Sequence, residues 1–259
     1  MDKLKILDLF SGIGGFSLGL ERTGGFETVA FCEIEPFPRR VLARHWPEVP
    51  CYEDVTKLTG NILKRDGISI DVITGGFPCQ DISTAGKQAG MASGTRSGLW
   101  SEIVRLIGEL RPQYIIVENV ANLLSGPSSK RGGWFGRVLG DLAECGYDAE
   151  WENIPAGAVG APHRRERVWI VAYPTKKQYA GKFFSFEHKK DFPYQSRASL
   201  LQANFIGLGT SRGDYSLRRG DGFPAFMDIL NAYGNAVVPQ IPEMIGRAIL
   251  DAELISPNR

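Results

Sequence analysis

The sequence has no apolar run near the roughly 20 residues that a membrane-spanning helix needs. Its first residues, "MDKLKILDLF", are charged and lead directly into a strand-like segment, so we expect no signal peptide. Cysteine and histidine are scarce: three histidines are present, and Cys32, Cys51, Cys79 and Cys145 form no CxxC pair. We therefore expect neither a disulfide framework nor a metal site, and a protein of the reducing cytoplasm.

The net charge is only +1, but the basic residues are concentrated in one segment. Twelve Lys and Arg stand against four Asp and Glu between His163 and Arg219, and the rest of the chain holds 18 basic and 25 acidic residues. A basic segment attached to an acidic body favours binding to a phosphate backbone. On charge alone, a solvated lysine-rich face is an equally good interpretation.

Short apolar segments alternate with amphipathic ones along the chain. Segments typical of buried strands lie at 5–10, 28–33, 70–76, 114–120 and 167–173. Segments with helical periodicity lie at 37–46, 99–110 and 242–255. This alternation predicts a Rossmann-like α/β fold, with a mostly parallel sheet covered by helices on both faces. Ligands of such sheets bind at the carboxyl ends of the strands, where the unusual residues of this sequence also fall.

The stretch "LDLFSGIGGFSLGLE" (7–21) is typical of a strand, a glycine turn and the start of a helix. Gly12, Gly14 and Gly15 would let a ligand approach the backbone closely. No GK[ST] follows, and the spacing differs from GxGxxG, which excludes a P-loop and the dinucleotide fingerprint. Glu33 ends the next strand and could bind a ribose, while Asp54 could bind an adenine. Together they indicate an adenosine-containing ligand without a pyrophosphate.

Two reactive side chains follow later strands. Cys79, in "GGFPCQDIS", comes after the strand at 70–76 and before a glycine-rich stretch (84–98) that has the composition of a mobile lid. Glu118 lies near the end of the apolar strand "YIIVENV", where a carboxylate is costly unless it has a partner or a function. Arginines in "PHRRERVWIV" precede another strand and are expected at the same edge. Taken singly, each feature has another interpretation. Cys79 could be a buried structural cysteine, Glu118 a core acid with satisfied partners, and the arginines part of a solvated rim.

The sequence resembles the C5-cytosine-specific DNA methyltransferases of bacteria and phages. The resemblance rests on "DLFSGIGG", "GGFPCQDIS", "ENV", "HRRERVWIV" and "YGNAVVPQI", which occur in that family's order between residues 8 and 241. It implies a catalytic and cofactor-binding domain at 1–173 and a short target-recognition region at 174–222. The segment 223–259 would return to the catalytic domain. A recognition region of this length predicts a short or loosely specified DNA target.

By this resemblance, Cys79 is the nucleophile that adds to C6 of a cytosine flipped out of duplex DNA. Glu118 would contact the ring N3 and the exocyclic amine, and Arg167 the cytosine carbonyl, with Arg165 supporting the same pocket. The methyl donor would be S-adenosyl-L-methionine, which leaves as S-adenosyl-L-homocysteine. The implied cofactor residues are Phe10, Ser11, Gly12, Gly14, Gly15, Glu33, Ile34, Asp54, Val55, Pro78, Asn235 and Ala236. The expected DNA contacts are Gln80, Ser83, Arg96, Lys176, Lys177, Lys189 and Lys190.

Phe183 and Phe184 belong to a group of aromatic residues that would suit a compact nucleic-acid surface in the recognition region. We expect a monomer that acts on double-stranded DNA, with a cognate restriction endonuclease as a possible partner. Two alternatives stay open: a tRNA cytosine-5 methyltransferase of the same fold, and a catalytically silent DNA-binding homologue. Silent homologues generally lose the cysteine or the glutamate, and both are present here.

Overall fold

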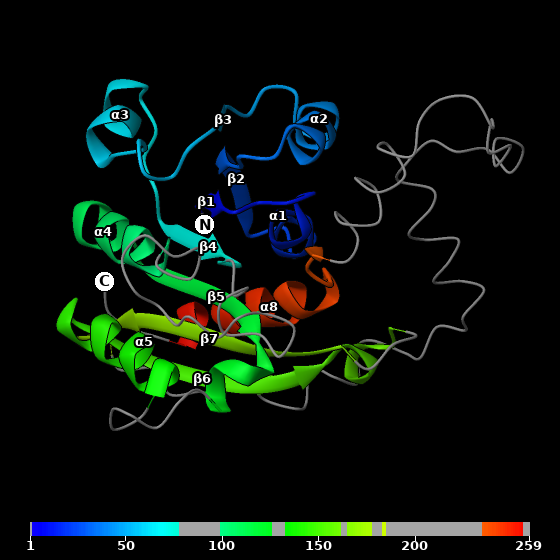
Figure 1. Ribbon diagram of the computed structural model, residues 1–259, viewed down its shortest axis with the longest axis vertical. Coiled ribbons are helices and arrows are strands. Elements are labelled where there is room, and N and C mark those ends of the chain that lie inside the picture. Colours follow the sequence, from blue (N-terminus) through cyan, green and yellow to red (C-terminus); the bar gives the residue numbers. More distant parts are fainter. Residues whose placement is uncertain are drawn as a thin grey trace, which may run out of the picture.

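The structure is a computed structural model that describes residues 2–77, 99–125, 133–161, 165–177, 183–184 and 235–255. In this part of the chain, one sheet has the strand order β3-β2-β1-β4-β5-β7-β6 (Figure 1). The strands are β1 (Leu4–Leu9), β2 (Phe26–Cys32), β3 (Cys51–Tyr52), β4 (Val72–Gly75), β5 (Tyr114–Val120), β6 (Tyr147–Pro155) and β7 (Glu166–Pro174). Strand β7 is antiparallel to both of its neighbours, and the remaining pairs are parallel. The predicted Rossmann-like fold is confirmed.

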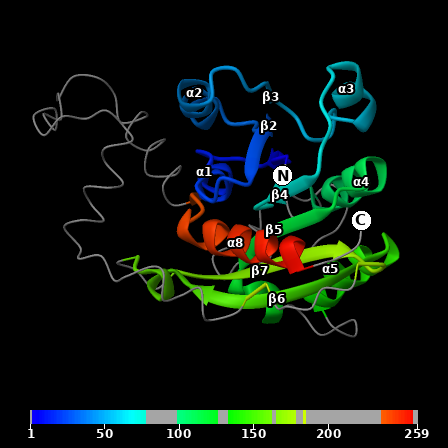
Figure 2. The same ribbon diagram turned by 180° about the vertical axis from the view of Figure 1, so that it is seen from behind.

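Helices cover both faces of the sheet. One face carries α1 (Gly15–Glu21) and α8 (Gln240–Ile255), and the other carries α4 (Trp100–Leu110) and α5 (Gly133–Glu144), as the two opposite views show (Figures 1 and 2). The further helices are α2 (Pro36–His45), α3 (Gly60–Arg65), η2 (Ala121–Ser125) and η3 (Ala156–Val159). Strand β5 separates the two cores: Ile115 and Val117 pack into one, and Ile116 into the other. Burial on both faces explains its continuous apolar sequence.

Strand β6 was not predicted from the sequence, for a physical reason. It lies at the edge of the sheet, where it pairs only with β7 among the described strands. Its sequence, "YDAEWENIP", keeps only Tyr147 and Ile154 buried and leaves Trp151 exposed. An edge strand that is largely accessible to water lacks the apolar run by which a strand is recognised.

The strand order reverses next to β1. The chain passes from β1 to β2 and β3 on one side, and then places β4 on the other side of β1. Ligands of open α/β sheets bind outside the carboxyl ends of the strands at such a reversal. The segments that leave β1 and β4 therefore flank the expected site, namely the glycine turn after Leu9 and the residues Gly76 and Phe77 after β4.

The antiparallel direction of β7 explains why the arginines at its start lie at the carboxyl edge of the parallel strands. In a parallel strand, residues that precede it would lie at the amino edge of the sheet. Because β7 runs the other way, Arg167 is paired with Val120, at the carboxyl end of β5. The sequence placed these arginines correctly but did not reveal the strand direction that puts them there.

Residues 237–239, from the "GNAVVPQ" motif, dock on the glycine face of α1. A Cβ atom at Gly15 would lie 2.6 Å from the Val237 carbonyl oxygen, and one at Gly19 would lie still closer to that of Pro239. Both distances are shorter than a carbon–oxygen contact allows, so glycine is required where this backbone crosses the helix. The crossing brings Val237 to Gly15, the first residue of α1 after the glycine turn.

We expect Gly19→Ala to destabilise the protein by about 1–3 kcal/mol, because the added methyl group would push residues 237–239 off α1. Urea unfolding measures the change in the free energy of unfolding. Gly108→Ala is the matched control: Gly108 lies within α4, and a Cβ there meets no atom within 4 Å. That variant should be neutral or gain up to about 1 kcal/mol. Equal destabilisation of the two variants would contradict this packing.

Candidate active site

The glycine turn after β1 is held in an unusual conformation. Phe10 has a φ of 52°, a left-handed value that is uncommon for a residue with a side chain, and Gly12 and Gly14 have φ values of 53° and 83°. The Gly12 N–H donates to Glu33 Oε2 at 2.7 Å, which ties the turn to the end of β2. A Cβ at Gly12 would meet no atom within 4 Å, so open space lies beside the turn.

Hydrogen bonds of Ser11 and Glu33 hold the carboxyl ends of β1 and β2 together. The Ser11 hydroxyl donates to the Asp8 carbonyl oxygen at 2.5 Å and accepts the Cys32 N–H at 3.3 Å. The carboxylate of Glu33 is buried, and its Oε1 accepts the Glu35 N–H at 2.8 Å. The structure thus brings together Phe10, Ser11, Gly12 and Glu33, four of the residues predicted to hold the cofactor.

A cavity of about 360 Å³ continues this edge past β2 and β3. Its lining includes Ile34, which is 62% exposed, together with Asp54, Lys57 and Tyr52. Asp54 Oδ1 accepts hydrogen bonds from the Thr56 backbone and hydroxyl, and these bonds, followed by Lys57, lower the pKa of Asp54.

Val55 lies in the hydrophobic core, 6% exposed, and its carbonyl accepts a hydrogen bond from Arg105 at 3.0 Å. The structure therefore gives Val55 a packing role. Ile34 and Asp54, in contrast, face the cavity.

Glu118 lies at the centre of a second cluster. Its Oε1 is 2.9 Å from Arg167 Nε and 3.9 Å from Arg165 Nη2, while Arg167 Nη1 donates to the Glu166 carbonyl at 2.8 Å. The sheet register explains the first contact: Glu118 is paired with Trp169, so Arg167, two residues before, has its side chain on the same face. A Cβ at Gly76 would lie 3.3 Å from Glu118 Oε2, so glycine leaves room beside that oxygen.

Burial dominates the electrostatics of this cluster. It raises the pKa of Glu118 above its ordinary value, and the positive charges of Arg167 and Arg165 offset this effect only in part. The pKa of Arg165 is lowered, first by burial and then by the like charge of Arg167. A carboxyl group that keeps its proton to higher pH than usual can act as a proton donor.

Asn119 lies next to Glu118 in β5 and was not singled out by the sequence. Its side-chain Nδ2 donates to the Phe77 carbonyl at 3.2 Å, and its Oδ1 accepts the Val120 N–H at 2.9 Å. Asn119 is 2% exposed, and Phe77 packs on Trp100 with ring centroids 5.3 Å apart. The "ENV" motif could have pointed to Asn119, because a buried amide side chain at the end of a strand needs hydrogen-bond partners.

Asp8 is a buried carboxyl group beneath the glycine turn. It accepts hydrogen bonds from the Ser17 hydroxyl at 2.9 Å and from the Thr74 hydroxyl at 2.7 Å. It therefore connects α1 with β4. Burial raises its pKa to about 7, against the lowering effect of these hydrogen bonds and with a further small rise from Glu33.

The pKa of Asp8 predicts a dependence of stability on pH. The unfolded chain loses this proton near its ordinary value of 3.8 and the folded protein near 7. The folded state thus binds more protons between these values, and its stability falls as the pH rises from about 4 to 7. Asp8→Asn should remove this contribution, about 4 kcal/mol for one such group. Urea unfolding at several pH values tests it, and identical pH profiles for the two proteins would contradict the prediction.

Several predicted residues lie outside the described part of the chain. These are Pro78, Cys79, Gln80, Ser83, Arg96, Lys189 and Lys190. Among the other predicted cofactor residues, Asn235 is exposed and Ala236 half-buried, and both directly precede the docked segment 237–239. Gly15 begins α1 beside that segment, whereas a Cβ at Gly14, which caps the helix, would lie 2.7 Å from the Trp46 ring.

Two predicted DNA contacts lie far from Glu118 along the sheet. Lys176 and Lys177 follow the end of β7, which is at the amino edge because β7 is antiparallel. Lys177 Nζ contacts Glu253 at 2.8 Å and lies over the Tyr114 ring, 5.1 Å from its centroid. The structure gives Lys177 a role in attaching α8 to the sheet and does not join these two lysines to the site cluster.

The interpretation of Phe183 and Phe184 as part of a nucleic-acid surface is corrected by the structure. The two residues are 1% and 8% exposed and belong to the core under α8. Phe183 packs against the rings of Tyr114 and Tyr173, and its N–H donates to Glu150 at 3.0 Å. A cluster of aromatic residues in a basic segment cannot by itself distinguish a binding surface from an anchor to the core.

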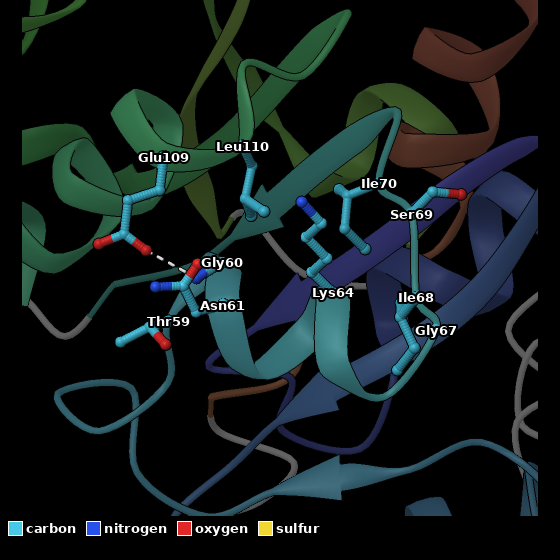
Figure 3. Close-up of a pocket in the computed structure, with 10 residues that line it drawn as sticks. All are labelled: Thr59, Gly60, Asn61, Lys64, Gly67, Ile68, Ser69, Ile70, Glu109 and Leu110. Atoms are coloured by element: carbon cyan, nitrogen blue, oxygen red, sulfur yellow. Dashed lines mark hydrogen bonds between the residues drawn. The ribbon is translucent and has the colours of Figure 1, made fainter.

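A larger cavity, of about 810 Å³, lies at the opposite edge of the sheet (Figure 3). It is lined by α3, by the residues that precede β4 and by the end of α4, and the Gly60 N–H donates to Glu109 Oε2 at 2.6 Å across it. This is the amino edge, away from the strand reversal, so its size does not make it the candidate site.

No group of three or more possible metal ligands occurs among the residues that the structure describes. Within the same residues, no helix is long and apolar enough to cross a membrane.

Comparisons with known proteins agree with the fold. A Type II methyltransferase of Bacillus subtilis, M2.BsuMI, is 36% identical over 173 residues, which are 65% of this chain and 42% of that protein. M.Sau3AI of Staphylococcus aureus is 36% identical over 70% of this chain and 46% of its own length. The chain thus spans about half the length of the curated relatives it matches.

Solved structures share the fold. A protein described as a DNA modification methyltransferase encoded within an E. coli prophage matches with a TM-score of 0.58 and 29% identity, over 71% of this chain and 50% of its own. The DNMT2 structure from Spodoptera frugiperda, at 24% identity and a TM-score of 0.56, supports the fold alone and covers 70% of this chain and 53% of its own. The family model for C-5 cytosine-specific DNA methylases matches residues 4–217. The chain therefore belongs to the C-5 cytosine-specific DNA methylase family.

Proposed function

We propose that this protein is a DNA (cytosine-5-)-methyltransferase that uses S-adenosyl-L-methionine. The observation that carries the proposal is the buried Glu118, held by Arg167 and Arg165 at the carboxyl edge and next to the strand reversal. Such a carboxyl group, with a raised pKa, suits donation of a proton to a heterocyclic base. The glycine turn and Glu33 lie at the same edge, where a second ligand would fit.

The residues at the glycine turn fit S-adenosyl-L-methionine. The open space beside Gly12 would accept the methionine part, the buried Glu33 carboxylate the ribose hydroxyls, and the 360 Å³ cavity the adenine. Ile34 and Asp54, at that cavity, and Phe10, at the turn, would then contact the base. When bound, the cofactor supplies an electrophilic methyl group for C5 of cytosine.

In the proposed reaction, the Cys79 thiolate forms a bond to C6, and the π electrons of the C5–C6 bond move to C5. Glu118 gives its proton to N3, which prevents negative charge from building up on the ring. Arg167 and Arg165 hold Glu118, and Arg167 also binds the ring carbonyl oxygen. After C5 is methylated, N3 returns its proton to Glu118 and water takes the C5 proton. The electrons of that C–H bond restore the C5–C6 double bond, and Cys79 leaves as a thiolate.

The substrate proposed is double-stranded DNA, from which the target cytosine must be flipped to reach Cys79. Gln80, Ser83 and Arg96 would contact the DNA around the vacated position, and Lys189 and Lys190 its phosphates. The names of the relatives support a role in a restriction-modification system or a phage, in the bacterial cytoplasm where such DNA lies. We propose a monomer, with a cognate endonuclease as its functional partner.

Transfer of a labelled methyl group tests the proposal. The protein is incubated with labelled S-adenosyl-L-methionine and either a duplex rich in cytosine sites or a transcribed tRNA. Label in the C5 position of duplex cytosine is expected. Label in the tRNA alone would identify an RNA methyltransferase of the same fold, and label in neither substrate would favour a silent DNA-binding homologue. Either result would contradict the proposal.

A further inference from the structure

The pairing of β4 with β5 ends before the catalytic residues. The last pair in the register is Gly75 with Val117, although β5 continues to Val120. Beyond this pair the chain leaves the sheet through Gly76 and Phe77 on its way to Cys79. The point at which it leaves determines where the nucleophile can lie, because two residues span at most about 7 Å.

The Asn119 side chain connects the two segments where the strand pairing has ended. Its amide donates to the Phe77 carbonyl at 3.2 Å, while its carbonyl accepts the N–H of Val120 at 2.9 Å. The contact is buried, with Asn119 2% and Phe77 3% exposed. A hydrogen bond without competing water gives a defined position to the backbone that it holds.

The Phe77 ring is held independently of its carbonyl. It packs on Trp100, whose Nε1 donates to Asp141 Oδ2 at 2.7 Å. The ring contact limits where Phe77 can move, and the hydrogen bond from Asn119 sets the direction of its carbonyl. Both constraints act two residues before Cys79.

Asn119 and Glu118 are consecutive residues of β5, so their side chains lie on opposite faces of the sheet. Glu118 meets Arg165 and Arg167 on one face, and Asn119 meets Phe77 on the other. A single strand end therefore carries the proposed proton donor and the group that holds the chain leading to the nucleophile.

We infer that Asn119 is a positioning residue that sets the location of Cys79 relative to Glu118 by holding the Phe77 carbonyl. The inference rests on the proposed function of these two residues. Attack on C6 and protonation at N3 must occur on one ring, so the nucleophile and the acid need a fixed separation. A displacement of about 1 Å at a reacting group can lower a rate on the order of 100-fold.

Two substitutions separate the two hydrogen bonds of Asn119. Asn119→Asp keeps an oxygen that can accept the Val120 N–H but has no amide to donate to Phe77. Asn119→Ala removes both bonds. Asn153→Ala is the matched control, because Asn153 and Asn119 are both in register with Val168, in the same row of the sheet, and the Asn153 amide contacts Glu166 instead.

The main measurement is the rate of covalent adduct formation with a duplex that contains 5-fluorocytosine. Affinity for S-adenosyl-L-methionine and the urea midpoint are measured in parallel. We expect both Asn119 variants to form the adduct 30- to 100-fold more slowly than the wild type, with cofactor affinity within twofold and the midpoint little changed. The Asn153→Ala variant should keep its rate within twofold.

Three outcomes would overturn the inference. The first is adduct formation within threefold of the wild-type rate in both Asn119 variants. The second is a wild-type rate in Asn119→Asp but not in Asn119→Ala. This result would assign the loss of rate to the hydrogen bond with the Val120 N–H and not to the bond with Phe77. The third is a parallel loss of rate, cofactor affinity and stability, which would indicate a general folding role.

Hydrogen exchange keeps the test independent of the proposed activity. If the wild-type protein forms no adduct, the proposed function fails, and the amide exchange of the peptide that contains Gly76 and Phe77 judges the inference. Faster exchange in this peptide for both Asn119 variants, with peptides of β1 and β2 unchanged, would support a specific hold on the chain. Unchanged exchange would overturn it.

Discussion

Cys79→Ala is expected to abolish methyl transfer to DNA completely. C5 of cytosine is a weak nucleophile, and without the thiolate no bond forms at C6 to supply C5 with electrons. The glycine turn and the Glu118 cluster are built from other strands, so cofactor affinity should stay within about twofold. Transfer of labelled methyl groups and equilibrium binding of the cofactor measure the two effects.

Cys145→Ala is the matched control for this prediction. Cys145 is a half-buried thiol after α5, and its backbone carbonyl accepts a hydrogen bond from Arg111 at 2.6 Å. Its replacement should leave methyl transfer unchanged. Residual transfer by Cys79→Ala above a few per cent of the wild-type rate would contradict the assignment of the nucleophile.

Glu118→Gln is expected to lower the rate of methyl transfer by 10³- to 10⁴-fold, near the upper end for loss of a general acid. Glutamine keeps the shape of the side chain but cannot pass a proton to N3. Negative charge would then develop on the ring after attack at C6 and raise the barrier to adduct formation. Single-turnover methyl transfer gives the rate, and Glu109→Gln at the opposite edge is the control, expected within twofold of the wild type.

The pH dependence gives this prediction a second signature. Burial raises the pKa of Glu118, so the protonated acid is present at low pH and is lost as the pH rises through that raised value. The rate of methyl transfer by the wild type should therefore fall as the pH rises, which gives its pH profile an alkaline limb. The Gln variant has no proton to lose at this position, so its rate should show no such fall. An alkaline limb of unchanged position in Glu118→Gln would rule out Glu118 as the acid.

The sequence predicted the fold well where apolar strands are buried on both faces. Strand β5 was located at its observed bounds, and the segments at 5–10 and 167–173 lie within a residue of β1 and inside β7. The edge strands β3 and β6 were missed, because β3 is two residues long and β6 is mostly accessible to water. Helix α5 was missed as well, since three glycines interrupt the periodicity of its sequence, "GWFGRVLGDLAE".

The site could be predicted only where its residues follow strand ends. Glu118 and the arginines were expected at one edge, and the structure brings them within 2.9–3.9 Å. The hydrogen bonds of Asn119 and Asp8 could not be predicted, because both depend on which strand lies beside β4 and in which register. The places of Lys177 and Phe183 depend likewise on the direction of β7, which composition does not reveal.

The most direct test of the account is the capture of the wild-type protein on a duplex that contains 5-fluorocytosine, in the presence of S-adenosyl-L-methionine. Fluorine at C5 cannot leave as a cation, so the covalent intermediate accumulates, and digestion followed by mass spectrometry identifies the attached residue. We predict a stable adduct on Cys79 that is absent in Cys79→Ser. An adduct on any other residue, or one that persists in Cys79→Ser, would contradict the account.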